Sequence, residues 1–322
     1  MSEQIFVIGA ITEQMQAALE TQFALHFETE IADSNAWLSA HGDSISYIIT
    51  NGHDGVKDDY LSQMPNVKII SNYGVGYDAI NVTEAAKRGI IVTHTPGVLN
   101  EEVATTALLL MLACYRELAF QEAHVRSGRW QTDGNAPLTR SADNRTIGIV
   151  GLGRIGEAVA RKCAPFNAEI LYHNRSEKDV PYRYMADLVA MAEACDVIIC
   201  TTPGGAGTAK IINQQVLEAL GPDGILINVA RGSVVDEEAL ITALSSGKLG
   251  WAGLDVFEKE PAVPQTLRDL PNTVLMPHVG SATHETRAAM GALTVDNVLS
   301  YHQDGTVISP VPECAAIARL KS

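Results

Sequence analysis

The chain has 322 residues, of which 46% are hydrophobic and 19% charged, and its formal net charge at pH 7 is −15. This length suggests two domains, and the hydrophobic fraction provides a large core and argues against disorder. The negative charge excludes nucleic acid as an expected partner, because a phosphate polymer would be repelled.

The N-terminal stretch MSEQIFVIGA has no basic region before its apolar run, so no signal peptide is expected. The longest strongly apolar run, residues 103–115, is too short to span a bilayer, so no membrane partner is expected. The five cysteines lack the paired spacing of a metal site, and four of them lie in apolar surroundings. We therefore expect a cytoplasmic protein with free thiols and no metal.

Short apolar runs alternate with helix-like stretches along the chain, which is typical of the α/β class. Residues 100–125 indicate one long helix, which Asn100 can cap and whose first turn carries two glutamates that favour the helix dipole. The polar stretch 126–145 is rich in Gly, Pro, Asn and Asp and predicts a loop or arm. In the first part of the chain, strands are expected at 5–10, 46–50, 66–71 and 90–95.

A second α/β unit is expected after the arm. It would end in a helix at 284–303, and the stretch SPVP at 309–312 indicates an irregular tail. The strands of this unit are expected at 146–150, 168–172, 197–201, 225–230, 251–256 and 273–276.

Residues 146–166, TIGIVGLGRIGEAVARKCAPF, contain a strand, a glycine-rich turn and a helix in that order. Gly151 permits a tight turn, Gly153 lets backbone N–H groups approach a pyrophosphate, and Gly156 lets the helix pack close to the strand. The helix N-terminus adds positive partial charge for the phosphates. The pattern predicts a dinucleotide site, the alternative being a tight corner with purely structural glycines. The predicted cofactor-binding residues of the turn are Gly151, Leu152, Gly153, Arg154, Ile155 and Gly156.

The end of the next strand bears on the choice of cofactor. A site for NAD usually keeps a carboxylate for the ribose about 20 residues after the turn. Here Asn174 stands at that position, followed by Arg175 and Ser176. Asn174 removes the repulsion of a 2′-phosphate, Arg175 offers a planar fork suited to phosphate, and Ser176 adds a hydroxyl donor. The sequence predicts NADP as the preferred cofactor, with NAD possible. The alternative is that Arg175 points to solvent and the site is unselective.

Three polar residues follow three strands of the second unit. Arg231 follows residues 224–230, Glu260 follows 250–257, and His278 follows 273–277. Ligands of parallel α/β sheets bind beyond the carboxyl ends of the strands, so the three side chains are expected on one edge, beside the dinucleotide.

The chemistry of this trio fits hydride transfer to a 2-keto acid. Arg231 can bind the carboxylate and polarise the carbonyl, and His278 can protonate the oxygen as hydride reaches the carbon. Glu260, paired with His278, favours the imidazolium form. Taken singly, Arg231 could cap a helix or form a salt bridge, Glu260 could be a solvated loop charge, and His278 could be a structural histidine. Their joint placement favours the catalytic interpretation.

From about residue 65 to 285, the chain resembles the D-isomer-specific 2-hydroxyacid dehydrogenase family, with its motifs in the family's order. The first 60 residues resemble it in pattern only. The motifs are NYGVGYDAINV (72–82), HTPGVLNEEVATTALLLML (94–112), GIVGLGRIG (148–156), INVARGSVVDEEAL (227–240), AGLDVFEKEP (252–261) and MPHVGSAT (276–283).

The resemblance implies an α/β fold of two Rossmann-like domains with doubly wound parallel sheets and an active site in the cleft between them. A flavodoxin-like substrate domain would comprise residues 1–99 and 290–322. A dinucleotide-binding domain would comprise residues 100–289, including the long helix and arm at 100–145.

The resemblance also implies roles for single residues at the substrate. It makes Arg231 the substrate-binding arginine, Glu260 the partner of the histidine and His278 the proton donor. The backbone N–H groups of Val75 and Gly76 would hold the substrate carboxylate, and the glycines on either side of Val75 allow a nest of donors. A plain turn is the alternative there. Leu99 is expected to line the substrate pocket.

Further cofactor contacts are implied by the same resemblance. Asp255 matches the residue that holds the nicotinamide carboxamide, the alternative being an exposed loop acid. Thr105 lies in a region that contacts phosphate, and Pro203 and Thr208 lie in the loop over the adenosine, although GGAGTAK (204–210) departs from the usual pattern. The predicted set is completed by Val229 and Gly280.

Family members are usually dimers formed through the long helix and the arm after it, so a homodimer is expected. Trp130 in the arm is expected to pack in that interface. The alternative is that Trp130 or Leu138 reaches a neighbouring active site and limits the size of the substrate.

The stretches NRS and GVLNEEVA resemble the NADP-using glyoxylate/hydroxypyruvate and hydroxyphenylpyruvate reductases of the family. The expected function is NADPH-dependent reduction of small 2-keto acids, glyoxylate and hydroxypyruvate first, to D-2-hydroxy acids. One alternative is an NAD-linked dehydrogenase that acts oxidatively. The other is a dinucleotide-sensing binding protein of the same fold.

Overall fold

The computed structural model describes residues 3–321 and divides the chain into two compact units. Unit 1 runs up to Leu99 and resumes at Thr283, and unit 2 is Asn100–Ala282. The second boundary thus precedes the expected position at residue 290. The physical reason is that the last long helix is continuous from His284, with the Thr283 hydroxyl capping it, and it packs as a whole within unit 1.

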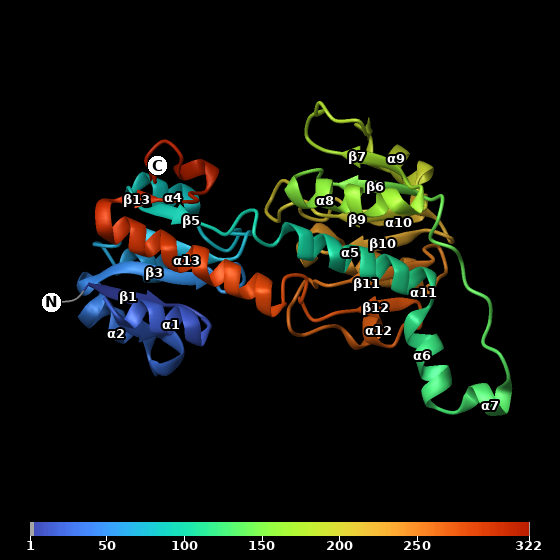
Figure 1. The fold of residues 1–322 in the computed structure, drawn as a ribbon, viewed down its shortest axis with the longest axis horizontal. Helices are drawn as coiled ribbons and strands as arrows, with labels where there is room; N and C mark the ends of the chain where they lie inside the picture. Colours follow the sequence, from blue (N-terminus) through green and yellow to red (C-terminus); the bar gives the residue numbers. More distant parts are fainter. Residues whose placement is uncertain (1–2, 322) are drawn as a thin grey trace. The chain divides into compact units, whose positions relative to one another are not determined.

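Unit 1 contains β1, β3 and β5 within one sheet (Figure 1). This parallel sheet has five strands in the order β2-β1-β3-β4-β5, which is the flavodoxin-like order. The predicted strands correspond to β1, β3, β4 and β5, while β2 was not predicted. All four residues of β2, ALHF, are only half-buried, so this edge strand lacks the apolar run that marks the others. The strands are β1 (Gln4–Val7), β2 (Ala24–Phe27), β3 (Ile45–Asn51), β4 (Ile69–Tyr73) and β5 (Ile91–Thr93).

Helices cover this sheet. The long helix α13 packs on β4 and α1, and a Cβ on Gly291 would lie 3.0 Å from the Met15 side chain, so the two helices meet closely. On β1, the Phe6 ring stacks on Trp37 and meets Tyr60 edge-on. The helical segments are α1 (Glu13–Glu20), η1 (Glu28–Glu30), α2 (Ser34–His41), η2 (Gly42–Ser44), α3 (Asp58–Ser62), α4 (Val82–Lys87) and α13 (His284–Asp304).

The tail after α13 is more ordered than expected. It forms β13 (Thr306–Val307), the short helix η5 (Pro312–Cys314) and β14 (Arg319–Leu320), with β13 and β14 paired in parallel. The Val311 N–H also donates to the Val92 carbonyl at 2.9 Å, so the tail extends the edge of the sheet at β5.

Unit 2 contains a parallel sheet of seven strands in the order β12-β11-β10-β9-β6-β7-β8. The order reverses between β6 and β9, as in doubly wound dinucleotide-binding sheets. The six predicted strands are present, and the two-residue edge strand β8 was not predicted. The strands are β6 (Thr146–Val150), β7 (Glu169–His173), β8 (Arg183–Tyr184), β9 (Val197–Cys200), β10 (Ile225–Asn228), β11 (Trp251–Leu254) and β12 (Thr273–Leu275).

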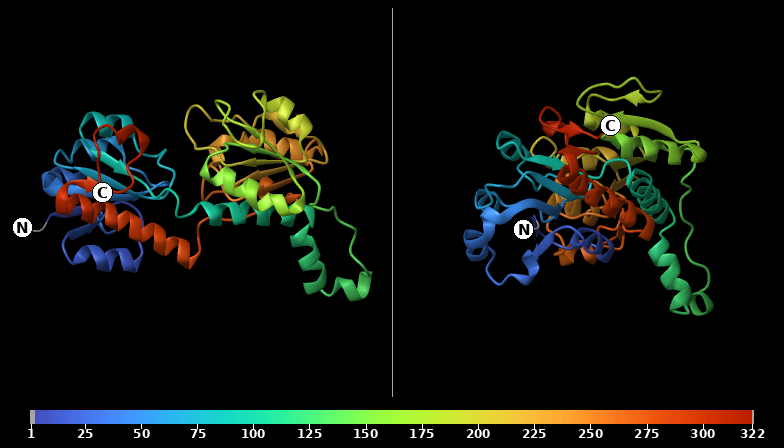
Figure 2. Two further views of the ribbon diagram at one scale, coloured as in Figure 1. Left: turned by 45° about the horizontal axis from the view of Figure 1, so that its top comes forward. Right: turned by 60° about the vertical axis from the view of Figure 1, so that its left-hand side comes forward.

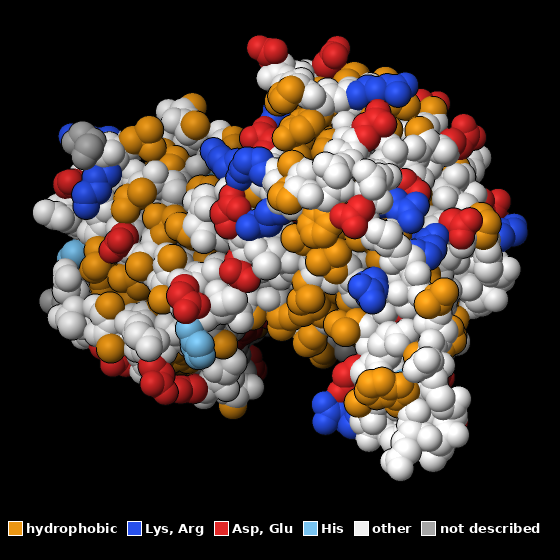
Figure 3. Space-filling model, turned by 45° about the vertical axis from the view of Figure 1, so that its right-hand side comes forward, with side chains coloured by type: hydrophobic (Ala, Val, Ile, Leu, Met, Phe, Trp, Pro, Cys, Tyr) orange, Lys and Arg blue, Asp and Glu red, His pale blue; other side chains and the backbone are white. Residues whose placement is uncertain are grey.

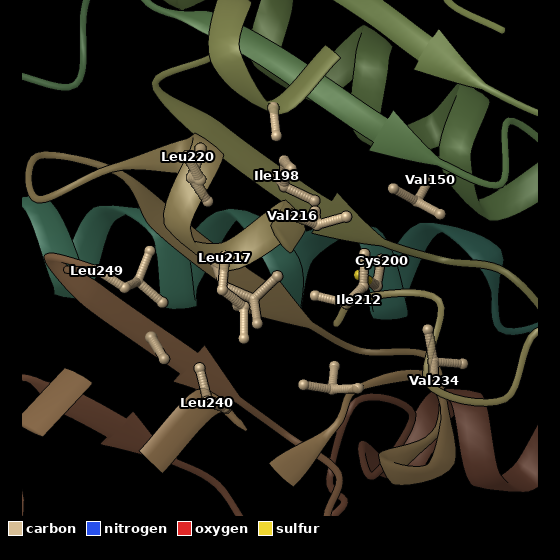
Figure 4. Packing of buried hydrophobic residues seen from close by; sticks show 14 of the residues in the cluster. Val150, Ile198, Cys200, Ile212, Val216, Leu217, Leu220, Val234, Leu240 and Leu249 are labelled. Carbon is tan, nitrogen blue, oxygen red and sulfur yellow. The ribbon is translucent and has the colours of Figure 1, made fainter. Parts of the chain in front are cut away.

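Helices pack on this sheet too, and α5 and α8 lie together against it. A further group, α9 to α11, packs over a buried apolar cluster that includes Ile198, Leu217 and Leu240 (Figure 4). The helical segments are α5 (Asn100–Tyr115), α6 (Leu118–Arg126), α7 (Arg129–Asp133), α8 (Arg154–Cys163), η3 (Ala164–Phe166), α9 (Leu188–Ala194), α10 (Gln214–Leu220), η4 (Gly232–Val234), α11 (Glu237–Ser245) and α12 (Gln265–Arg268).

The single helix expected over 100–125 is wrong. Helix α5 ends at Tyr115, and α6 continues in a direction bent by 64°. Glu117 between them adopts a left-handed conformation with φ 46°, which ends the helical path. Asn100 is the first residue of α5 rather than its cap, and its buried Oδ1 has no partner among residues 3–321.

Helices α6 and α7 form an arm that projects from unit 2 (Figure 2). Hydrophobic side chains lie exposed on this arm (Figure 3), including Val125 and Trp130, each 58% exposed. Within residues 3–321, no single helix is long and apolar enough to cross a membrane; only the bent pair α5 and α6 would be, by length and composition.

Candidate active site

Arg231, Glu260 and His278 follow three neighbouring strands, β10, β11 and β12. Because these strands are parallel, their carboxyl ends share one edge of the sheet, as predicted. The loops after β10 and β11 approach each other so closely that a Cβ on Gly232 would lie 1.9 Å from the backbone of Phe257. The glycine next to Arg231 therefore lets its loop meet the loop that carries Glu260.

His278 and Glu260 form a direct pair. The His278 Nδ1 lies 2.7 Å from Glu260 Oε2, and Glu260 Oε1 accepts the Phe257 N–H at 3.0 Å. The glutamate is thus fixed at both oxygens, and its side chain is 18% exposed against 43% for the histidine. Because a carboxylate only accepts, Nδ1 is assigned the hydrogen, and Nε2 is left for a substrate.

The backbone of His278 is strained. Its φ of 53° lies in the left-handed region, which non-glycine residues rarely adopt and which is often found at functional sites. The conformation is held by Asp255, whose carbonyl accepts the His278 N–H at 2.8 Å. The two carboxylate oxygens of Asp255 accept the N–H groups of Val279 and Gly280, each at 2.8 Å.

Asp255 is therefore a buried acid that shapes the loop after β12, and it is only 2% exposed. Burial raises the pKa of its carboxyl, while the two backbone N–H bonds oppose that rise. The alternative of an exposed loop acid is wrong. The hydrogen bonds from the loop of His278 to Asp255 were not predicted, because the sequence carries no signal for a contact across 24 residues. Its role toward a nicotinamide stays a prediction, as does that of Gly280.

Arg231 is half-buried, and its backbone is held by the side chain of Asn228, whose Nδ2 donates to the Arg231 carbonyl at 2.9 Å. Its Nη1 donates to the Ala230 carbonyl at 2.8 Å. A mainly apolar cavity of about 230 Å³ adjoins the histidine and glutamate. It is lined by Phe257, Glu260, Pro261, Val263, Arg268, Leu275, Met276, Pro277 and His278.

The glycine-rich turn joins β6 to α8, and each glycine occupies a different environment. Gly151 has φ +96°, and a Cβ there would lie 2.7 Å from the Thr202 backbone. A Cβ on Gly156 would lie 2.7 Å from the Gly151 carbonyl oxygen, so the helix packs against the strand end. Around Gly153 nothing lies within 4 Å of such a Cβ. This open backbone at the N-terminus of α8 fits the approach of a pyrophosphate.

Asn174 lies directly beside this turn, because its Oδ1 accepts the Leu152 N–H at 2.8 Å. Arg175 and Ser176, which follow it, are exposed. Arg154, inside the turn, is also exposed, and neither it nor Arg175 forms an ion pair with any residue from 3 to 321.

The loop after Asn174 is closed by Lys178, which reasoning from sequence did not single out. Lys178 Nζ donates to the Leu152 carbonyl at 2.9 Å and pairs with Glu157 at 2.5 Å. Its backbone N–H donates to the Tyr172 hydroxyl at 2.9 Å, and that hydroxyl donates to the Lys178 carbonyl at 3.2 Å. Residues 174–178 therefore form a loop tied to the turn at both ends.

The remaining predicted cofactor residues lie in unit 2 with varied surroundings. The Thr105 hydroxyl donates to the Glu101 carbonyl of its own helix at 2.9 Å. The Thr208 hydroxyl donates to the Pro203 carbonyl at 2.7 Å and so closes the loop after β9. Leu152 and Val229 are buried, and Ile155 is half-buried.

In unit 1, Val75 and Gly76 lie in a half-buried loop directly after β4, and Leu99 is buried. All five cysteines are buried free thiols, as expected, and burial raises the pKa of each.

Comparisons with known proteins identify the family of this chain. A family model described as "D-isomer specific 2-hydroxyacid dehydrogenase, NAD binding domain" matches residues 108–280. The chain is 39% identical over 308 residues to glyoxylate/hydroxypyruvate reductase A of Arabidopsis thaliana, covering 95% of this chain and 98% of the relative. It is 40% identical over 308 residues to 2-ketogluconate reductase of Gluconobacter oxydans, again covering 95% and 98%.

Solved structures are also similar to this chain. The NADPH-dependent glyoxylate/hydroxypyruvate reductase from Sinorhizobium meliloti, in complex with NADP and malonate, matches with a TM-score of 0.93 and 43% identity over the whole of both chains. The chain therefore belongs to the D-isomer specific 2-hydroxyacid dehydrogenase family, and the resemblance found in its motifs is confirmed. It is an oxidoreductase that acts on CH–OH groups.

Proposed function

We propose that this protein reduces small 2-keto acids to D-2-hydroxy acids with NADPH, and that glyoxylate and hydroxypyruvate are its first substrates. The observation that carries the proposal is the His278–Glu260 pair at 2.7 Å, at the carboxyl edge of the same sheet whose β6 leads into the glycine-rich turn. Relatives named as glyoxylate and hydroxypyruvate reductases support the choice of substrate.

Each residue of the trio has a defined task in this reaction. Arg231 binds the substrate carboxylate and polarises the keto group, because a guanidinium forms two charge-assisted bonds with such a ligand. His278 donates the proton on Nε2 to the keto oxygen, which becomes the hydroxyl. Glu260 accepts a hydrogen bond from Nδ1 and so keeps the imidazole in one orientation. The reduced nicotinamide supplies the hydride.

The preference for NADPH rests on the loop after β7. Asn174 binds the turn through its neutral amide oxygen, so no negative charge lies at this position. Arg175 and Ser176 are exposed next to it. A 2′-phosphate at this place would meet a guanidinium and a hydroxyl, with an amide in place of a carboxylate at position 174. The bound NADP in the Sinorhizobium meliloti structure supports this choice.

Unit 2 would serve as the dinucleotide-binding domain and unit 1 as the substrate domain. In unit 1, the N–H groups of Val75 and Gly76 would hold the substrate carboxylate, and Leu99 would contribute to the substrate's surroundings. Asp255, Thr105, Pro203, Thr208, Val229 and Gly280 are proposed to contact the cofactor.

We further propose a homodimer formed through the arm. Leu118 and Val125 of α6, Trp130 of α7 and Leu138 are all more than half exposed, and Leu138 is 99% exposed. Apolar side chains gathered on a projecting element are typical of an interaction surface. A reducing compartment such as the cytoplasm fits five buried cysteines that are not paired.

The test is the initial rate of NADPH and NADH oxidation with glyoxylate, hydroxypyruvate and phenylpyruvate, measured side by side. Faster turnover with NADPH is expected. If NADH were faster, the assignment of Arg175 and Ser176 would be wrong while the catalytic trio would stand. If neither cofactor were oxidised with any of the three acids, the proposed activity would be overturned in favour of a dinucleotide-sensing role.

A further inference from the structure

The loop after β4 is held by side chains from two neighbouring strand ends. Asn72, fully buried in β4, donates through Nδ2 to the Gly74 carbonyl at 2.9 Å and to the Gly76 carbonyl at 3.0 Å. His94, directly after β5, lies with Nδ1 3.0 Å from the Val75 carbonyl oxygen. Three successive carbonyls of the loop are thus bound by Asn72 and His94.

Fixing a carbonyl also fixes the N–H of the same peptide group. A trans peptide is planar, and its N–H points opposite to its C=O. The peptide bonds of this loop are trans, so the N–H groups of Val75, Gly76 and Tyr77 are turned away from the side chains that hold the carbonyls. Within residues 3–321, no protein acceptor takes any of these three hydrogens. A run of such donors is suited to an anion.

We propose that Asn72 and His94 are positioning residues for the substrate carboxylate, which they serve by aiming the N–H groups of the loop without touching the substrate. This inference rests on the proposed reduction of 2-keto acids. A carbonyl oxygen can only accept, so His94 is assigned the hydrogen on Nδ1. Its ring also meets the Tyr77 ring edge-on at 5.3 Å, which limits its rotation.

The consequence of losing either side chain follows from the same geometry. Without its donor, a carbonyl in a half-buried loop loses a hydrogen bond and becomes free to turn toward solvent. A peptide that turns over presents its oxygen, not its hydrogen, to the anion. Binding of the carboxylate should therefore weaken while the proton-donating histidine in unit 2 is left intact.

The decisive variants are His94→Phe, which keeps an aromatic ring and removes the donor, and His94→Gln, which restores an N–H. His26→Phe is the matched control, because His26 is a half-buried histidine of unit 1 whose ring lies 2.9 Å from Gln4 Oε1, a side chain outside the loop after β4. Each is compared with the wild type for KM and kcat with glyoxylate, for the inhibition constant of oxamate, and for the dissociation constant of NADPH.

His94→Phe should raise the KM for glyoxylate and the inhibition constant of oxamate about tenfold, the equivalent of one lost hydrogen bond. Its kcat and its NADPH dissociation constant should change less than about twofold, His94→Gln should recover most of the loss, and His26→Phe should behave as the wild type. Asn72→Leu removes two hydrogen bonds and should raise the same two constants further. If this variant does not fold, the comparison of His94→Phe with His94→Gln still tests the inference.

An unchanged oxamate constant in His94→Phe would overturn the inference and leave the proposed function standing, provided that the wild type reduces glyoxylate and binds oxamate. Equal weakening of NADPH and oxamate would also overturn it, because that pattern indicates a general loss of structure. If the wild type neither reduced a keto acid nor bound oxamate, the proposed function and the inference would both fail.

Discussion

Two glycine-rich strand ends, one in each unit, present backbone N–H groups in different ways. The turn after β6 leads directly into α8, a helix of 10 residues, so its donors share the positive end of a helix dipole. The loop after β4 has no such helix, because α4 begins only at Val82. Its peptide groups are instead held by Asn72 and His94. At the first site, glycines leave room beside the backbone ahead of a helix, and at the second, two side chains orient the peptide groups.

The difference extends to the chemistry of the two edges. In unit 2, the groups that we propose to take part in the reaction are side chains, above all the imidazole of His278 and the carboxylate of Glu260. In unit 1, we propose that the loop after β4 binds the substrate through backbone donors. If this division is correct, replacing a side chain in unit 2 should remove the reaction, whereas changes around the loop in unit 1 should weaken binding alone.

The largest effect is therefore expected for His278→Ala. Loss of a general acid lowers kcat by about 10²–10⁴-fold. The dissociation constant of NADPH, measured by fluorescence titration, should stay within about twofold. Glu260→Gln is the companion variant. Its kcat should fall less than that of His278→Ala, because an amide oxygen can still accept the hydrogen bond from Nδ1. Failure of His278→Ala to bind NADPH would show that the histidine has been misassigned.

The next effect concerns the glycine turn, where two neighbouring positions should respond differently. Gly151→Ala must place a side chain at φ +96° and against the Thr202 backbone, so it should lower the free energy of unfolding by about 2 kcal/mol or more. Gly153→Ala has open space around it and should keep the stability of the wild type while binding NADPH more weakly. Denaturation and cofactor titration separate the two.

Tight NADPH binding by Gly153→Ala would contradict the proposal that phosphate approaches the backbone there. Full stability of Gly151→Ala would contradict the steric account of the turn. The pair thus tests, within one loop, which glycine serves the fold and which serves the ligand.

Much of unit 2 could be predicted from sequence, because its central strands are short apolar runs and its turn is marked by glycines. The rule that parallel strands share a carboxyl edge was enough to place Arg231, Glu260 and His278 together from the sequence alone. The edge strands β2 and β8 could not be predicted, since they are short and only partly buried.

Other features depend on contacts that leave no local pattern. The break after α5 rests on a left-handed Glu117, with no glycine or proline to mark it. The strained backbone of His278 is held by Asp255, and the 174–178 loop is tied down by Lys178. The contacts of Asp255 and Lys178 join residues far apart in the sequence, so only the folded chain reveals them.

A smaller effect is expected at the loop of residues 174–178, which we propose selects the cofactor. Arg175→Ala should weaken NADPH binding by about 10- to 100-fold, the range of a lost charge-assisted contact, and NADH binding by less than about twofold. Lys178→Met should shift selectivity in the same direction by a smaller factor, because Lys178 only holds the loop. Arg319→Ala, at an exposed arginine of unit 1, serves as the control. If Arg175→Ala weakened the binding of NADPH and NADH equally, the proposal that this loop binds the 2′-phosphate would be wrong.

The smallest effect is expected at a hydrogen-bonded cluster around Glu3 in unit 1. Glu3 accepts hydrogen bonds from the Tyr47 hydroxyl, from Lys68 Nζ at 2.9 Å and from His302 Nδ1 at 2.7 Å, so it links the residue before β1 to α13. Burial raises the pKa of Glu3, but these bonds outweigh it and lower the pKa from 4.5 to about 2.

Because this pKa is depressed in the folded state, the stabilisation is fully present above about pH 4.5 and is lost as the pH falls toward 2. Glu3→Gln should therefore lower the Tm at pH 7 by no more than about 2 °C, as befits a partly exposed ionic cluster. The gap between variant and wild type should narrow steadily below pH 4.5 in thermal melts. A difference in Tm that stayed constant from about pH 7 to about pH 3 would mean that the charge of Glu3 does not stabilise the fold. The cluster would then act through packing and neutral hydrogen bonds, as Asn72 and His94 do at the loop after β4.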